Sequence, residues 1–164
     1  MNYDQQRSTY LGPLSWGSTE FHSNLDSIDT IEHDVFLAVL SHRLAELYSS
    51  ALDLPAVEAD TTDIDHTPFP ADKGEELWHA LKRKFEPLDS YWVIFDSTEK
   101  APAVQGTLAG DISEIYSDLK HDIDLEQQDV SQADSLWELR FSFRSHWGKH
   151  LLDALVAIHD RHVE

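Results

Sequence analysis

Apolar residues recur at helical spacing in four stretches of the chain. Residues 30–52, 72–85, 107–126 and 132–162 each place apolar side chains three or four positions apart, the period of an amphipathic helix. The first stretch shows the pattern in Phe36, Leu40, Leu44, Leu47 and Ala51. The sequence therefore predicts an all-α fold, a helical bundle of three long helices and one short helix.

Local signals mark the beginnings and ends of these helices. Asp29 or Thr30 is a suitable N-cap for the first helix, because a short polar side chain can accept a hydrogen bond from the first turn. Asp72 and Glu75 have the spacing of a capping box at the start of the short helix, and Pro87 follows its end.

The remaining stretches lack a helical period. Residues 1–27 mix Gly, Pro, Ser, Thr and Asn, so we expect a loosely structured N-terminal arm ahead of a single helical domain over residues 28–164. Residues 55–70 contain three prolines and are expected to form a loop. Residues 91–96 are aromatic and β-branched, which favours a short extended or irregular buried segment without an obvious partner strand.

Composition narrows the class of protein. The 164 residues are 41% hydrophobic, enough for one core, and cysteine is absent, which excludes disulfide scaffolds and thiolate chemistry. No stretch approaches the roughly 18 to 20 apolar residues of a membrane span, and the N-terminus lacks the regions of a signal peptide. We therefore expect a cytoplasmic protein without a membrane segment.

The charge balance is strongly acidic, with 12 Lys and Arg against 31 Asp and Glu and a formal net charge of −19. Binding to a phosphate backbone depends on cationic side chains, so direct nucleic-acid binding is not expected. The acidity favours solubility or a saline habitat, and mimicry of nucleic acid toward a basic partner is the alternative.

The segment from 137 to 150 is the densest in aromatic and basic residues, and Arg140 is its most unusual member. At 100° per residue Arg140 falls at the centre of the apolar stripe, between Leu136 and Phe143. Three interpretations remain open: an internal ion pair between helices, an anion or carboxylate receptor at the base of a pocket, and a side chain that stretches to the surface.

His146 and His150 lie four positions apart at the edge of this stripe, with Asp153 about one turn further on. Two imidazoles at this spacing can share a metal ion. However, Trp147 occupies the position of the catalytic Glu in a zincin motif, and the sequence indicates no third ligand. Hydrogen bonds from these histidines to neighbouring helices are the alternative, so no cofactor is expected and a divalent metal remains a second hypothesis.

Acidic residues form a row on the third predicted helix, where Asp111, Glu114 and Asp118 share one side. The row is rotated away from the apolar stripe, and the helix has no Glu-x-x-His pair of the kind found in di-metal bundles, so a solvated face is expected. Asp111 falls in the first turn, where a carboxylate favours the helix dipole. Asp118 is the better candidate partner for a neighbouring helix.

Several of these stretches resemble a bacterial domain-of-unknown-function family, number 5063, over roughly residues 30 to 160. The resemblance lies in Ala45-Glu46-Leu47-Tyr48, Tyr91-Trp92 with Phe95-Asp96, Leu108-Ala109 with Asp111-Ile112, Ile115-Tyr116-Ser117-Asp118-Leu119-Lys120, Trp137-Glu138-Leu139-Arg140-Phe141-Ser142-Phe143 and Ser145-His146-Trp147-Gly148-Lys149-His150. The resemblance implies a helical cytoplasmic bacterial protein. It implies no particular reaction, because the family has no assigned activity.

Two functions follow as hypotheses. The first is a small acidic interaction module without catalytic activity, whose acidic surface or exposed aromatic patch meets a protein partner or a second copy. The second is a metal- or small-anion-binding helical protein, such as a hydrolase, with a pocket around Arg140, His146 and His150 that Asp111, Asp118 or Asp153 would complete. The first is preferred because the ligand set of the second is incomplete.

Overall fold

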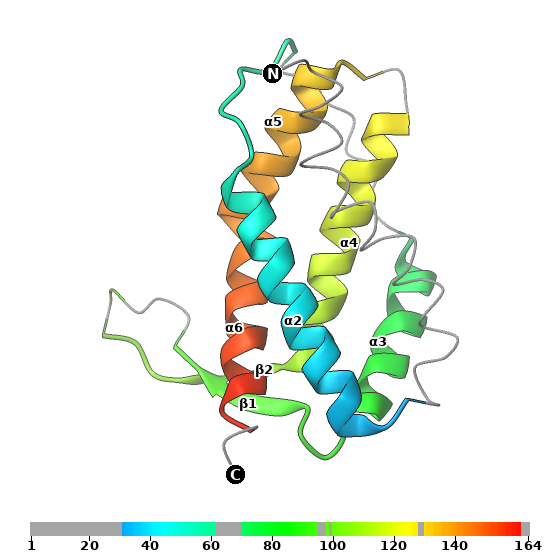
Figure 1. Cartoon of the computed structure of the whole chain (residues 1–164), viewed down its shortest axis with the longest axis vertical. Coiled ribbons are helices and arrows are strands. Elements are labelled where there is room, and N and C mark those ends of the chain that lie inside the picture. Colours follow the sequence, from blue (N-terminus) through cyan, green and yellow to red (C-terminus); the bar gives the residue numbers. More distant parts are fainter. Residues whose placement is uncertain (1–30, 62–69, 95–97, 99, 128–129, 162–164) are drawn as a thin grey trace.

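All four predicted helical stretches are helical in the computed structural model, which describes residues 31–61, 70–94, 98, 100–127 and 130–161 (Figure 1). The elements in chain order are α2 (His33–Leu52), α3 (Ala71–Phe85), β1 (Ser90–Val93), β2 (Val104–Thr107), α4 (Leu108–Gln127), α5 (Gln132–Ser142), the π-helix η2 (Phe143–Trp147) and α6 (Gly148–His159). The prediction of an all-α bundle is confirmed, with a small two-stranded sheet added. The arm predicted over residues 1–27 lies outside the described residues.

The bundle is built around α4. This helix packs against α3 and α6 and also contacts α5, η2 and β2, while α2 packs against α6. The largest fully buried side chains come from all of these helices except α2: Leu81, Phe85, Leu108, Leu139, Trp147, Leu151 and Ile158. One continuous hydrophobic core therefore joins the helices. None of the described helices is long and apolar enough to cross a membrane.

The helix starts differ from the predicted ones. The N-cap of α2 is Glu32, whose carboxylate accepts a hydrogen bond from Val35 N at 3.1 Å, and Asp29 and Thr30 lie outside the described residues. The predicted capping box of α3 is wrong, because α3 begins at Ala71 without a side-chain cap. Asp72 lies inside the first turn, where its charge meets the positive end of the helix dipole.

Residues 91–93 of the predicted extended segment lie in β1, which has a partner strand that the sequence pattern missed. Residues 95 and 96 of that segment lie outside the described residues. β2 pairs with β1 in antiparallel fashion, with Tyr91 opposite Gly106 and Trp92 opposite Gln105. The Tyr91 ring lies directly over Gly106, where an added Cβ would come within 2.8 Å of the ring. Glycine at this position lets the aromatic ring cross the sheet. β2 leads straight into α4, so the sheet fixes where that helix begins.

The fourth predicted helix is continuous but contains a π-helix. The N–H of Gly148 donates to the carbonyl of Phe143, five residues earlier, so η2 holds one residue more per turn than its neighbours. The extra residue changes the phase of the buried face. Leu139 is 2% exposed and fills the core position, whereas Arg140 is half-buried at the edge of the face. The prediction that Arg140 lies at the centre of the stripe is wrong, because the buried face of α5 passes through Leu139, which lies on the other side of the line from Leu136 to Phe143.

Gly148 is the residue that allows this π-turn. A Cβ built at Gly148 would lie 2.4 Å from the Phe143 carbonyl oxygen and 2.8 Å from its ring. We expect Gly148→Ala to lower the free energy of unfolding by about 1 to 3 kcal/mol, because backbone atoms must move to admit the methyl group. Urea denaturation checks this, with Gly74→Ala in α3 as a control that should gain up to about 1 kcal/mol from helix propensity. An unchanged midpoint for Gly148→Ala would show that the turn does not require glycine.

The described part of the predicted 55–70 loop contains no helix or strand, as expected. Its backbone is held by α5. One carboxylate oxygen of Asp134 accepts hydrogen bonds from the N–H groups of Asp60 at 2.7 Å and Thr61 at 3.0 Å. These bonds lower the pKa of Asp134, with the Thr61 bond the largest cause.

Candidate functional site

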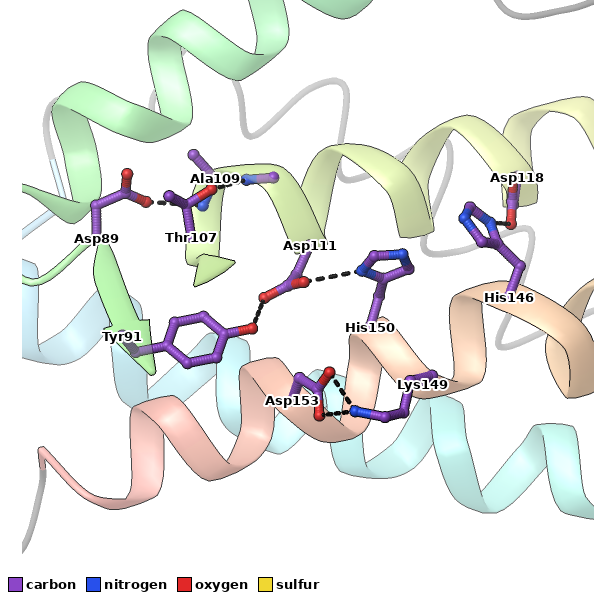
Figure 2. Close-up of polar contacts among 11 residues, drawn as sticks. Asp89, Tyr91, Thr107, Ala109, Asp111, Asp118, His146, Lys149, His150 and Asp153 are labelled. Carbon is purple, nitrogen blue, oxygen red and sulfur yellow. Dashed lines mark hydrogen bonds and ion pairs between the residues drawn. The ribbon is translucent and has the colours of Figure 1, made fainter. Parts of the chain in front are cut away.

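Two Asp–His pairs lie side by side where α4 faces the C-terminal helical run (Figure 2). Asp111 and Asp118 are seven residues apart on α4, about two turns, so their side chains share one face. His146 and His150 are one turn apart on η2 and α6, which run antiparallel to α4. Nδ1 of His146 lies 2.7 Å from Asp118 Oδ2, and Nδ1 of His150 lies 2.9 Å from Asp111 Oδ1.

Asp111 belongs to the more buried of the two pairs and has a second partner, Tyr91. It is 6% exposed, so the prediction of a solvated acidic face is wrong for this residue. Its second oxygen accepts a hydrogen bond from the Tyr91 hydroxyl, and its first contacts His150. One buried carboxylate thereby joins β1, α4 and α6. The helical period alone did not show this, because Tyr91 folds over Asp111 from the sheet.

The surroundings of Asp111 favour defined protonation states for both of its partners. Burial raises the pKa of Tyr91, and the hydrogen bond to the Asp111 carboxylate raises it further, so the phenol stays protonated and donates. The hydrogen bond to Asp111 raises the pKa of His150 while partial burial opposes the rise, and the charges of Glu114 and Asp153 also favour the imidazolium. His150 therefore holds its proton to higher pH than an isolated histidine.

The second pair, His146 with Asp118, is more open to solvent. The His146 side chain is 47% exposed and the Asp118 side chain 24%, against 31% and 8% for His150 and Asp111. The two imidazoles contact each other edge to face, with ring centroids 4.8 Å apart and an interplanar angle of 79°. In the neutral state a proton on Nδ1 faces the carboxylate, which leaves Nε2 of each ring as the basic nitrogen. The structure thus places two partly exposed imidazole rings in contact, each held at Nδ1 by a carboxylate of α4.

The other predicted site residues lie apart from these pairs. Asp153 binds Lys149 on its own helix, so it contributes to the cluster as a nearby negative charge. Arg140 forms no ion pair with a carboxylate of the described residues. The structure therefore brings together Asp111, Asp118, His146 and His150 but does not add Arg140 to them.

Asp89 is a residue of the site region that the sequence analysis missed. It is 5% exposed and precedes β1, yet its carboxylate accepts a hydrogen bond from Ala109 N at 2.9 Å, in the first turn of α4. Its own carbonyl accepts from Leu108 N, also at 2.9 Å, and the Thr107 hydroxyl accepts from Gly110 N. The N-terminus of α4 is therefore capped partly from a segment about 20 residues away, for which no local signal exists.

The described residues contain no group of three or more His, Asp or Glu side chains placed to hold one metal ion. The site as described offers paired imidazoles supported by carboxylates and a tyrosine hydroxyl. This arrangement can exchange protons or offer two nitrogen ligands, and the two Asp–His pairs join α4 to η2 and to α6.

Comparison with known proteins gives a fold and a family. No curated protein sequence matches the chain. The crystal structure of protein BF1032 from Bacteroides fragilis is similar, with a TM-score of 0.76 at 22% sequence identity, over 96% of this chain and 92% of that one. At this identity the likeness shows a shared fold. Residues 16–164 match a family model that takes in part of the predicted arm and the whole 55–70 loop, and the chain therefore belongs to the family described as Domain of unknown function (DUF5063).

Proposed function

We propose that this protein is a non-catalytic interaction module that binds a protein partner through the β1–β2 hairpin, with Trp92 as the anchor. The supporting observation is the exposure of Trp92, which at 74% exceeds that of every other large apolar side chain among the described residues. Ile94 at 47% and Val104 at 46% are exposed on the same hairpin. Tryptophan is the residue type most enriched among interface side chains that dominate binding energy.

The hairpin is held firmly at its base, which suits it to binding. Tyr91 is bonded to Asp111, and Asp89 to the first turn of α4. Arg161 Nη2 donates to the Ser90 carbonyl at 2.8 Å, which ties β1 to the residues just after α6. Figure 1 shows both strands leaving the bundle beside this end of α6. A binding element that is ordered before contact loses less conformational entropy on association.

The net charge of the chain indicates the charge of the partner that it attracts. At a net charge of −19, two copies repel each other, and a partner with a basic rim around an apolar pocket is attracted. We therefore infer a basic protein partner. Its attraction should raise the association rate and weaken with added salt, because exposed charges are screened within about 10 Å at 0.1 M salt.

The test places a photo-crosslinking amino acid in cells at position 105, the exposed strand residue opposite Trp92, so that the anchor itself is kept, and then measures binding with the purified cross-linked partner. Trp92→Ala should weaken the affinity about 30-fold, the effect of losing about 2 kcal/mol at a dominant interface residue. Leu52→Ala is the matched control, because Leu52 is 62% exposed but ends α2 at the other end of the bundle. It should leave the affinity unchanged.

Two outcomes would contradict the proposal. Equal affinities for the wild-type protein and Trp92→Ala would show that the hairpin is not the interface. A cross-link to a second copy of the chain, with a dimer in sedimentation equilibrium that Trp92→Ala disrupts, would replace the basic partner by self-association.

A further inference from the structure

We infer that His146 and His150 form an exchangeable site for a divalent transition-metal ion, for which Zn²⁺ is the probe. The inference does not depend on the hairpin interface. It starts from the position of the two imidazoles one turn apart on η2 and α6, both partly exposed and in contact with each other. Neutral imidazole is a ligand suited to zinc, copper and nickel.

The ring separation suits a shared ion. Two imidazoles bound through Nε2 to one ion at about 2.0 to 2.1 Å, at a right or tetrahedral angle, have ring centroids about 4.5 to 5.2 Å apart. The observed separation of 4.8 Å falls within this range. The two rings are therefore close enough to share one ion when both Nε2 atoms turn toward it.

The carboxylates supply the support that metal-bound histidines require. A metal-binding histidine almost always donates its other ring N–H to a carboxylate, carbonyl or water, which fixes the tautomer and orients the ring. Asp118 and Asp111 contact Nδ1 of His146 and His150 respectively, and Figure 2 shows both carboxylates reaching the rings from α4. Within the described ranges, neither Nε2 has a hydrogen-bond partner, so both nitrogens are available to an ion.

The rest of the coordination shell comes from outside this pair. The described residues place no third His, Asp or Glu at the site, and Asp153 is bound to Lys149. Water completes the shell of an ion bound here, which makes the site open and the ion exchangeable. The negative charge of the chain, including Glu114 and Asp153 near His150, concentrates cations at this surface.

The experiment titrates ZnCl₂ into metal-free, tag-free protein at about pH 8, above the ordinary imidazole pKa of about 6.5, and follows the heat of binding and the histidine ring nitrogen resonances. Because Asp111 raises the pKa of His150, any imidazolium there must release its Nε2 proton when zinc binds. One ion should bind per chain, and the Nε2 resonances of His146 and His150 should shift. His146→Ala should weaken binding at least 10-fold. Asp118→Asn should weaken it about 10- to 100-fold by the loss of ring orientation, with an unchanged melting temperature in the absence of zinc.

His79→Ala is the matched control. His79 is 54% exposed on α3 and also lies four residues from an acidic residue, Glu75, but no second histidine of the described residues contacts its ring. This variant should bind zinc as the wild-type protein does. Wild-type protein that binds no zinc, or His146→Ala that binds it with unchanged affinity, would overturn the inference without bearing on the hairpin interface.

Discussion

Trp147→Ala should lower the free energy of unfolding by about 3 to 5 kcal/mol, the largest effect expected of a single substitution in this chain. Trp147 has no exposed surface and ends the π-helix at the centre of the bundle. Its ring packs on Phe143 with centroids 4.7 Å apart, and its Nε1 donates a hydrogen bond to the Ser142 hydroxyl at 3.0 Å. Alanine would leave a cavity that helices on several sides cannot fill.

Urea denaturation measures the loss of unfolding free energy in Trp147→Ala. Trp92→Ala is the control, because it makes the same substitution at an exposed position. Trp92 is 74% exposed, so its loss should change the unfolding free energy by less than about 1 kcal/mol. Trp147→Phe separates packing from hydrogen bonding, because it keeps an aromatic ring and removes the N–H donor. A Trp147→Ala midpoint near that of Trp92→Ala would contradict the central place of Trp147 in the core.

Helical period accounts for most of what the sequence predicts correctly about the fold. Residues such as Leu81, Leu108 and Leu151 lie on predicted apolar stripes and are fully buried. The period fails at the π-helix, because one extra residue in a turn rotates everything before it relative to everything after it. Glycine at position 148 permits this turn, because a Cβ there would lie 2.4 Å from the Phe143 carbonyl oxygen.

Only one of the two strands is predicted from the sequence, because β1 is rich in residues that favour strands and β2 is not. Tyr91 to Val93 are aromatic and β-branched, whereas β2 contains Gln105 and Gly106 and is exposed along half of its length. Strand pairing is a tertiary property, and a short polar strand becomes visible only beside its partner.

Four of the six candidate site residues form two pairs in the structure, whereas Arg140 and Asp153 lie apart from them. The sequence predicts Asp118 as a partner for a neighbouring helix, and the structure pairs it with His146. The helical period predicts a solvated face for Asp111. The prediction fails because Tyr91, on a strand about 20 residues earlier, reaches over and covers the carboxylate. Burial of a helical carboxylate by a distant aromatic side chain leaves no trace in local periodicity.

Replacement of Asp111 should have the second-largest effect on stability. Asp111→Ala removes the acceptor for the Tyr91 hydroxyl and the partner of His150, both partly buried. The expected loss is about 2 to 4 kcal/mol, because removing one member of a buried polar pair leaves the others unsatisfied. The hairpin should loosen as well, since its base is tied to α4 through this carboxylate.

The loss caused by Asp111→Ala should depend on pH because of His150. The hydrogen bond to Asp111 raises the pKa of His150 in the folded protein above its ordinary value of about 6.5. The stability from this pair is therefore fully present below about pH 6.5 and is lost as pH rises through the raised pKa. We expect Asp111→Ala to cost more at about pH 6 than at about pH 9. Tyr91→Phe removes only the tyrosine bond, so its cost should be equal at both pH values, and equal costs for Asp111→Ala would contradict a charged His150 in the pair.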